Sequence, residues 1–287
     1  MRPFEFHRAR DAQALETLSS GPSPTALLAG GQTLVPALRR RAESPARVVD
    51  VKPLLATDVM HEVEEAGRVS IGAGATHAAL ASDPTLTEIA PTLAALAAHV
   101  GDPAVRNRGT LGGSLARPHP AGDWPAAALA LDATLITDRR TLAFTDLPTA
   151  PLGDDGELLT RIRFARPERA VYAKLLHPAE RYAMVGVFVA RVGDGLRVAV
   201  TGVSERGAVR WQAAEREADA GLPSLAPAVS PDVPDARGDA LGSAAYRAVL
   251  AARLLELARQ RLHAAGHGAI VLVHGQPLDE RVMPAPS

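Results

Sequence analysis

The chain has 287 residues, 47% of them hydrophobic and 22% charged, and a formal net charge of -1, as in an ordinary globular protein of two or three modest domains. The near-neutral charge gives no basic field for nucleic acid or an anionic membrane, and no apolar run approaches the ~20 residues of a membrane-spanning helix. With no cysteine, this chain can hold no disulfide, thiolate metal site or iron–sulfur cluster of its own.

The sequence also indicates where the protein is located and whether it binds a metal. The first residues lack the apolar core of a secretion signal, so the cytoplasm is the expected location. The nine histidines show no spacing typical of a zinc site, so no metal is expected.

The N-terminal part of the chain predicts a small β-loop-α-β unit behind a short helix. Its elements are a helix at 11–18, a strand at 25–29, a helix at 33–41 and a strand at 47–51. The first of these strands leads directly into the glycine pair Gly30–Gly31.

A second unit follows with a strand, two helices and another strand. These elements are a strand at 69–74, a long helix at 85–100 ended by Gly101-Asp102-Pro103, a helix at 123–131 and a strand at 133–137. The long helix would bury Leu86, Ile89, Leu93, Leu96 and Val100. A second glycine pair, Gly112–Gly113, lies between the two helices.

From Glu157 onward the pattern changes to consecutive strands. Strands at 158–164 and 171–176 are predicted to pair, and strands at 184–191 and 196–203 form a hairpin through Gly193-Asp194. Residues 222–239 are predicted to be an irregular linker. The tail at 269–284 resembles a hairpin that could dock on a partner, and a disordered end is equally compatible with it.

The last long element is a helix that Ser243 caps and that runs to Leu262. Helical spacing predicts one buried stripe on it, made of Tyr246, Val249, Leu250, Leu254 and Leu257.

The strongest functional signal is the pair of glycine segments, Ala29–Leu34 and Thr110–Leu115. Each contains a Gly-Gly pair and ends in a hydroxyl residue followed by leucine. Glycine permits positive φ and close approach of a ligand, and successive N–H groups in such a turn form an anion site. Either segment alone is as compatible with a simple tight turn, but two together suit the adjacent phosphates of a dinucleotide. Neither has the spacing of a Rossmann turn or the lysine of a P-loop.

These segments also carry a family resemblance. Leu28–Pro36 resembles the first flavin loop of the medium, FAD-binding subunits of molybdenum hydroxylases, the carbon monoxide dehydrogenase and xanthine dehydrogenase family. Arg106–Leu115 resembles their second loop, and Pro118–Asp123 resembles the segment after it. Further matches in family order are Ile71–Ala73, Glu157–Leu159, Tyr172–Lys174 and Ala245–Arg247, so that the resemblance covers about residues 3 to 262.

The resemblance implies an α+β fold: a vanillyl-alcohol-oxidase-like FAD-binding domain of two subdomains, followed by a C-terminal antiparallel sheet with helices. The implied boundaries are 1–53 and 54–166 for the subdomains, 167–263 for the C-terminal domain and 264–287 for the tail.

The resemblance also implies a set of FAD-binding residues and no catalytic residue in this chain. The set is Ala29, Gly30, Gly31, Gln32, Thr33, Leu34, Thr110, Leu111, Gly112, Gly113, Ser114, Asp123, Leu152 and Lys174. The backbone amides of 29–33 and 110–114 would wrap the pyrophosphate, with hydroxyl donors from Thr33, Thr110 and Ser114, and Leu152 would face the isoalloxazine. Ser114 stands where asparagine is usual in the family.

Two of these assignments, Asp123 and Lys174, have structural alternatives, and so has one further residue, His119. Asp123 would bind sugar or ribityl hydroxyls or cap the helix that follows it, and the two roles are compatible. Lys174 would stabilise the reduced flavin, or would be a solvated strand residue. His119 could approach the cofactor, although a lone histidine in a proline-rich loop is more often exposed.

The implied function is electron transfer within a complex. A small subunit with two 2Fe-2S clusters would pass electrons to the FAD of this chain, a large subunit would carry molybdopterin, and the whole would form a dimer of heterotrimers. The acceptor stays open among NAD, a quinone and oxygen. Two alternatives are a stand-alone flavin oxidase or dehydrogenase, which would want a catalytic base or a tyrosine pair, and a non-redox scaffold packed through its glycine loops.

Overall fold

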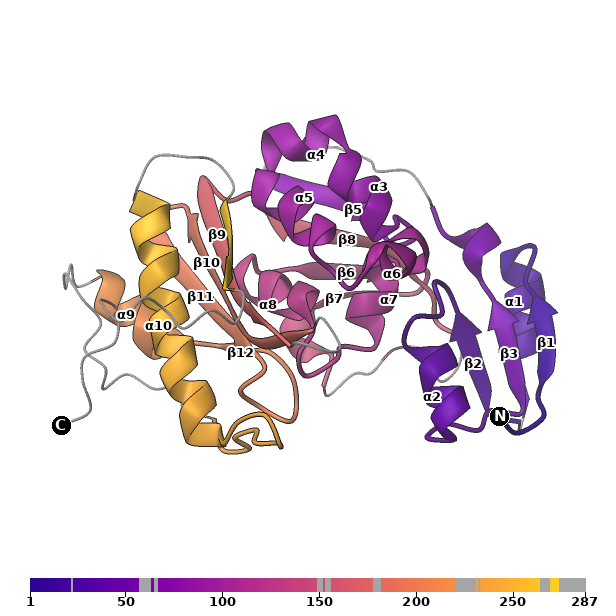
Figure 1. Cartoon of the computed structure of the whole chain (residues 1–287). Helices are drawn as coiled ribbons and strands as arrows, with labels where there is room; N and C mark the ends of the chain where they lie inside the picture. The colour runs from indigo at the N-terminus through magenta and orange to yellow at the C-terminus, as the bar shows by residue number, and fades with distance from the viewer. Residues whose placement is uncertain are drawn as a thin grey trace.

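The computed structural model describes residues 1–21, 23–56, 63–64, 67–148, 152, 156–177, 182–219, 231, 233–263 and 269–273. The chain forms a mixed helix and sheet structure with three sheets that follow one another along the molecule (Figure 1). The N-terminal sheet lies at one end, a five-stranded sheet lies in the middle, and a second five-stranded sheet lies at the other end.

The N-terminal sheet is parallel and has the strand order β1-β3-β2. Its elements are β1 (Glu5–Arg8), α1 (Ala12–Ser19), β2 (Thr25–Leu28), α2 (Leu34–Arg40), β3 (Arg47–Asp50) and the 3-10 turn η1 (Lys52–Leu54). The Asp11 carboxylate accepts a hydrogen bond from the Ala14 amide and so caps α1. The predicted β-loop-α-β unit is present, with the first glycine segment between β2 and α2.

The middle sheet is antiparallel, in the order β4-β5-β8-β6-β7. Its strands are β4 (Val63–Glu64), β5 (Arg68–Gly72), β6 (Thr134–Thr137), β7 (Thr141–Ala143) and β8 (Leu159–Ala165), with the 3-10 turn η2 (Phe144–Asp146) after β7. Between β5 and β6 the chain forms α3 (His77–Ser82), α4 (Pro84–Ile89), α5 (Pro91–Ala98), α6 (Pro103–Arg108), α7 (Leu111–Ala116) and α8 (Asp123–Ala130).

The helix predicted over 85–100 is wrong as a single helix. It is divided at Ala90 into α4 and α5, because Pro91 occupies the first position of α5 and cannot continue a preceding helix. The predicted apolar face is buried at Leu86, Leu93 and Leu96, which are inaccessible to solvent.

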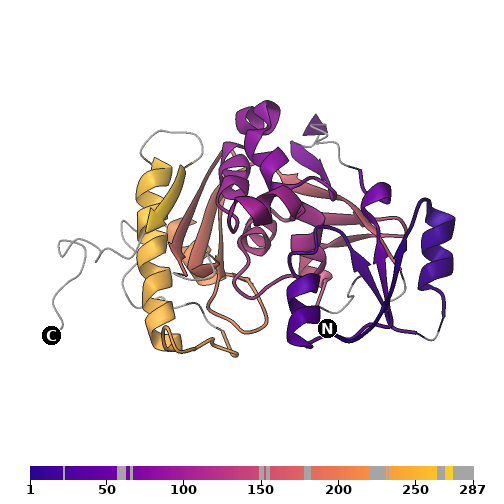
Figure 2. The ribbon, with the colours of Figure 1, turned by 45° about the vertical axis from the view of Figure 1, so that its right-hand side comes forward.

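The C-terminal sheet has the order β12-β11-β10-β9-β13. Its elements are β9 (Arg169–Leu176), β10 (Ala183–Val192), β11 (Gly195–Thr201), β12 (Val209–Arg210), α9 (Gln212–Asp219), α10 (Ala244–His263) and β13 (Ala269–Val273). The predicted hairpin is confirmed, since β10 and β11 pair antiparallel and Gly193 in their turn has φ +55°. Figure 2 shows α10 along one face of this sheet, and α8 packs against β10 and β11 between this sheet and the middle one.

Two predicted strand pairings differ from the structure. β8 does not pair with β9, because both of its edges are taken by β5 and β6 of the middle sheet. Residues 269–273 of the predicted tail hairpin form β13, which pairs in parallel with β9 of the chain's own sheet. The rest of that hairpin, from 274 to 284, lies outside the described residues, as does most of the predicted linker.

The face that α10 buries also differs from the prediction. The Ser243 hydroxyl caps the helix by accepting from the Tyr246 amide at 3.2 Å, as expected, but Tyr246 is 48% exposed and Val249 56% exposed. The side chain of Arg247 turns inward and donates to the carbonyls of Met184 and Gly202. Leu250 and Leu254 of the predicted stripe are buried as expected. The full set of buried residues on the helix is Arg247, Leu250, Ala251, Leu254, Leu255, Ala258 and Leu262.

None of the helices within these described ranges combines the length and apolar composition needed to cross a bilayer.

Candidate functional site

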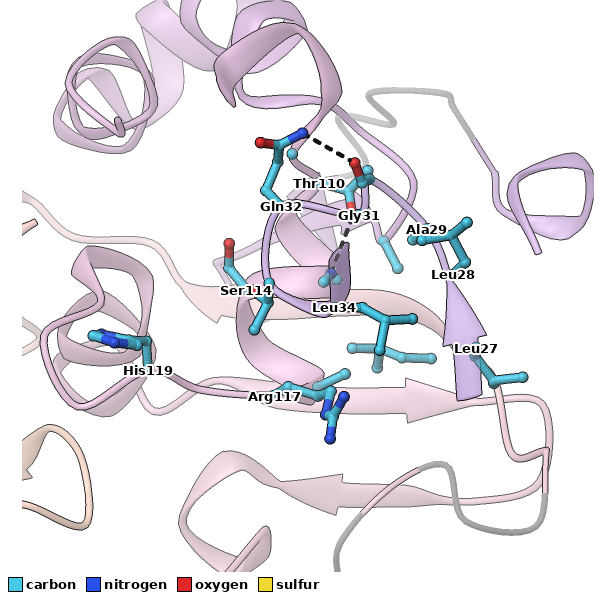
Figure 3. A pocket seen from close by; sticks show the side chains of 18 of the residues that line it. Leu27, Leu28, Ala29, Gly31, Gln32, Leu34, Thr110, Ser114, Arg117 and His119 are labelled. Carbon is cyan, nitrogen blue, oxygen red and sulfur yellow. Dashed lines mark hydrogen bonds between the residues drawn. The ribbon is translucent and has the colours of Figure 1, made fainter. Parts of the chain in front are cut away.

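A cleft of about 480 Å³ is lined by both glycine segments, where the N-terminal sheet meets the middle unit. In Figure 3, Gly31 and Gln32 of the first segment lie beside Thr110 and Ser114 of the second. The predicted residues that line this cleft are Ala29, Gly30, Gly31, Gln32, Thr33, Leu34, Thr110, Gly112, Gly113, Ser114, Asp123 and Leu152. Leu111 and Lys174 are fully buried and are not part of the lining.

The first glycine segment presents a row of backbone donors. It leaves β2 at Leu28 and enters α2 at Leu34, and Gly31 at φ +75° makes the turn between them. None of the hydrogen bonds found among the described residues uses the backbone N–H groups of 30–33. Four successive amides without acceptors at the wall of a cleft form an anion-binding concavity.

The second glycine segment differs from the predicted loop because it forms helix α7, which the Thr110 hydroxyl caps. The amides of Leu111 and Gly112 donate to the carbonyls of Ala75 and Ala73 at 3.0 and 2.8 Å. Those of Gly113 and Ser114 donate to the side chain and carbonyl of Thr110, both at 3.1 Å. The prediction that the amides of 111–114 are available to a pyrophosphate is therefore wrong. This segment presents to the cleft its hydroxyl groups and the backbone surface of its glycines, which carry no side chain.

The four glycines of the two segments have different physical roles. A Cβ on Gly30 would collide with the Arg108 carbonyl oxygen, and one on Gly112 would lie 2.6 Å from the Ala73 Cβ. Gly30 therefore allows close packing against the end of α6, and Gly112 allows close packing against Ala73, which follows β5. A Cβ on Gly113 would meet only the Thr110 hydroxyl, at 3.0 Å, so this position is open toward the cleft. At Gly31 glycine is required, because the positive φ of this residue would strain any side chain that has a Cβ.

Two residues that were not predicted from the sequence, His77 and Trp124, also line the cleft. His77 begins α3 and is 1% exposed. The Trp124 indole N–H donates to its Nδ1 at 3.2 Å, and its Nε2 lies 3.3 Å from the Ser114 hydroxyl oxygen. Burial, with the nearby Arg106 guanidinium, lowers the pKa of His77 to about 4. The imidazole is therefore neutral near pH 7. No spacing motif marked it, because its partners are distant in sequence.

A buried ion pair joins the cleft to the C-terminal sheet. The Asp123 carboxylate accepts from the Lys174 ammonium at 2.8 Å and from the Tyr172 hydroxyl at 2.6 Å. Lys174 also donates to the His99 carbonyl at 3.3 Å. Burial raises the pKa of Tyr172 well above its usual value, and the adjacent Asp123 charge adds to this shift.

This arrangement corrects two of the structural alternatives. The N-cap of α8 is Gly122, and Asp123 makes no capping hydrogen bond because its oxygens face Lys174 and Tyr172. Lys174 is not solvated, since β9 places it fully inside the molecule. Lys174 does not line the cleft itself, and its connection to the cleft is its ion pair with Asp123.

Two further pairs of side chains line the cleft. The His119 and Tyr182 rings stack at a centroid distance of 4.3 Å and an interplanar angle of 17°, and both line the cleft. His119 is therefore part of the cleft, and Tyr182 was not foreseen. Arg117, which directly follows α7, forms an ion pair at 2.8 Å with Glu43, which follows α2. That pair connects the two sides of the cleft.

Comparison with known proteins identifies the class to which this fold and cleft belong. The family described as the FAD binding domain in molybdopterin dehydrogenase matches residues 2–167, more than half of the chain. The chain therefore belongs to this family, and it is a FAD-binding oxidoreductase subunit of the carbon monoxide and xanthine dehydrogenase type.

Individual relatives extend the match beyond that domain. The carbon monoxide dehydrogenase medium chain of Hydrogenophaga pseudoflava is 30% identical over 279 residues, covering 89% of this chain and 95% of the relative. The nicotine 6-hydroxylase medium subunit of Paenarthrobacter nicotinovorans is 32% identical over 200 residues, covering 64% and 69%.

Solved structures agree with this assignment. One is the Hydrogenophaga pseudoflava carbon monoxide dehydrogenase that lacks the Mo-pyranopterin moiety, with a TM-score of 0.76 at 27% identity over 92% of this chain and 98% of that chain. Another is quinoline 2-oxidoreductase from Pseudomonas putida 86, with a TM-score of 0.75 at 26% identity over 91% and 97%.

Proposed function

We propose that this chain is the electron-transfer subunit of a molybdenum-containing hydroxylase or dehydrogenase complex. It would accept electrons from the 2Fe-2S clusters of a small partner subunit and pass them to an external acceptor. Substrate oxidation would take place at the molybdopterin of a large subunit, and the assembly would be a dimer of heterotrimers. The observation that carries this proposal is the row of four free amides at 30–33 in the cleft of a FAD-family chain.

The residues of the cleft fit a dinucleotide. We assign the pyrophosphate to the amides of 30–33, where the donors have no protein acceptor, and to the open surface of Gly113. The Ser114 and Thr110 hydroxyls lie on the facing wall, and Asp123 is available to sugar or ribityl hydroxyls. Leu152 is assigned to the isoalloxazine end. When bound, FAD supplies a carrier that can take up two electrons and release them.

The proposed role of Lys174 is to hold the Asp123 carboxylate in place. An ionised carboxylate that is almost fully buried needs a counter-charge, and Lys174 supplies it at 2.8 Å. Tyr172 fixes the second carboxylate oxygen, so the orientation of Asp123 is set from the C-terminal sheet. This differs from a direct contact between Lys174 and the flavin.

We propose the vanillyl-alcohol-oxidase-like division of the chain on the basis of its sheets. The parallel sheet falls within 1–53, and the middle sheet within 54–166, so that these two subdomains flank the cleft. The third unit begins at 167, and the pairing of β13 with β9 extends it from the expected 263 to at least 273.

The placement of the tyrosines argues against a stand-alone flavoenzyme. All three lie in the described part of the chain, at Tyr172, Tyr182 and Tyr246. Tyr172 is buried on Asp123, Tyr246 is exposed on α10, and Tyr182 is the one that lines the cleft. No two of them can act together on one flavin ring, and His77 is occupied by Trp124 and Ser114.

Reconstitution with the partner chains tests the proposal. The partner subunits are reduced chemically, freed of excess reductant and mixed with the FAD-loaded chain while the flavin absorption band is followed. We expect the band to bleach in the mixture, because the reduced clusters of the partner subunits would pass electrons to the flavin, and to recover when an acceptor is added. Substrate oxidation by the isolated chain, or a flavin band that reduced partners leave unchanged, would contradict the subunit role.

A further inference from the structure

We infer that His77 is a positioning residue that makes the Ser114 hydroxyl a one-way hydrogen-bond donor toward the phosphates of FAD. The inference rests on the proposed placement of the pyrophosphate between the two glycine segments. It concerns three side chains: Trp124 donates a hydrogen bond to His77, and His77 donates one to Ser114.

The donor and acceptor roles in these hydrogen bonds follow from the chemistry of Trp124. An indole N–H can only donate, so the Nδ1 of His77, 3.2 Å from the Trp124 nitrogen, must accept and carries no proton. A neutral imidazole then has its proton on Nε2. That N–H donates to the Ser114 oxygen at 3.3 Å.

The consequence for Ser114 is a fixed role. A serine hydroxyl can donate or accept, and in a helix it often turns back to a carbonyl four residues earlier. No such bond from Ser114 to the Thr110 carbonyl is present among the described residues. Because its oxygen already accepts from His77, its own proton is left to donate into the cleft that Ser114 lines. A phosphate oxygen is the acceptor that this geometry fits.

The imidazole is held so that its two nitrogens cannot exchange places. Its ring is stacked on Trp124, with centroids 6.1 Å apart. On another side it lies against the backbone of Gly109, where an added Cβ would be 3.0 Å from the ring. The His77 amide donates to the Gly109 carbonyl at 3.0 Å, which fixes the start of α3. Burial keeps the ring neutral and therefore keeps the donor direction near neutral pH.

A double-mutant cycle on FAD affinity tests the inference. The full chain is stripped of FAD and titrated with FAD, as wild type and as the variants Ser114→Ala, His77→Phe and the double variant. One hydrogen bond is worth about 0.5–1.5 kcal/mol, so His77→Phe should weaken FAD binding about two- to twelvefold. In the Ser114→Ala background, His77→Phe should have no further effect. Equal effects of His77→Phe in both backgrounds would overturn the inference.

Conservative variants and spectroscopy separate this role from a structural one. His77→Gln retains an N–H donor and should bind FAD within about twofold of wild type. If His77→Phe does not fold, Trp124→Phe takes its place in the cycle. Trp124→Phe removes the donor to Nδ1, so that the His77 proton is no longer confined to Nε2, but it leaves the imidazole ring in place. Nitrogen-15 NMR of the chain, with His77 assigned from the His77→Gln variant, should show a neutral ring protonated at Nε2. A ring protonated at Nδ1 would contradict the inference.

The same cycle distinguishes failure of the inference from failure of the proposed function. If Ser114→Ala leaves FAD affinity unchanged, the phosphates do not lie at Ser114 and the proposed placement is wrong. If Ser114→Ala weakens binding but His77→Phe does not, the placement stands and the positioning role of His77 is wrong.

Discussion

Gly113→Val is expected to give a folded chain that binds FAD at least about tenfold more weakly than wild type, a loss of about 1.4 kcal/mol or more. A Cβ at this position would meet only the Thr110 hydroxyl oxygen within the protein, at 3.0 Å, so a small movement of that side chain makes room for it. The added methyl groups would instead occupy the cleft wall that we assign to the pyrophosphate. The measurement is FAD content per chain after purification, together with titration of the stripped chain.

Gly112→Ala is the matched contrast on the neighbouring residue. Its Cβ would lie 2.6 Å from the Ala73 Cβ and 2.8 Å from the Ala73 carbonyl oxygen, so it should destabilise the fold. Among the FAD-free chains, the thermal midpoint should fall much less for Gly113→Val than for Gly112→Ala, although Gly113→Val should lose FAD. Full FAD occupancy in Gly113→Val would mean that the pyrophosphate lies elsewhere. Gly31→Val should also lose FAD, because valine resists φ +75°.

Lys174→Met is expected to lower the free energy of unfolding by about 3–5 kcal/mol. Lys174 is fully buried, and its removal leaves the Asp123 carboxylate, itself 4% exposed, without a counter-charge. Tyr172 would still donate to the carboxylate, but a neutral hydroxyl does not balance a buried charge. Chemical denaturation of the FAD-free chain measures the effect without a contribution from ligand binding.

The chain provides a control for this experiment, since Lys52 is its only other lysine. Lys52 is 42% exposed and lies 3.8 Å from Asp50, so Lys52→Met should cost about 1 kcal/mol or less. The double variant Asp123→Asn, Lys174→Met removes both charges and should be more stable than Lys174→Met alone. Equal costs for the two lysine variants would show that the buried pair does not stabilise the fold as proposed.

Local features of the fold could be predicted because the cause lies within a few residues. Ser243 caps its helix as expected, and Gly193 turns the β10–β11 hairpin. The glycine segments also marked the cleft, since both adjoin elements that end there. The break at Pro91 was equally local, and the apolar periodicity of the surrounding residues obscured it.

The features that could not be predicted depend on contacts between residues that are far apart in the sequence. Lys174 and Asp123 are 51 positions apart, and His77 and Ser114 are 37 apart, so no spacing rule relates them. The pairing of β8 with β5 joins segments some 90 positions apart, which alternation within a strand cannot specify. In α10, Leu250 and Leu254 of the predicted stripe are buried, but Tyr246 and Val249 are exposed, and the buried Arg247 hydrogen-bonds to carbonyls that lie far from it in the sequence. The second glycine segment had the expected residues, but capping by Thr110 made it a helix.

A crystal structure of the full chain with FAD tests the central claim most directly. We expect the pyrophosphate oxygens within hydrogen-bond distance of the backbone amides in 30–33, with Gly113 in van der Waals contact and the Ser114 hydroxyl donating to a phosphate. Leu111 and Lys174 should remain out of contact with the cofactor. A pyrophosphate bound away from the first glycine segment, with those four amides still lacking acceptors, would contradict it.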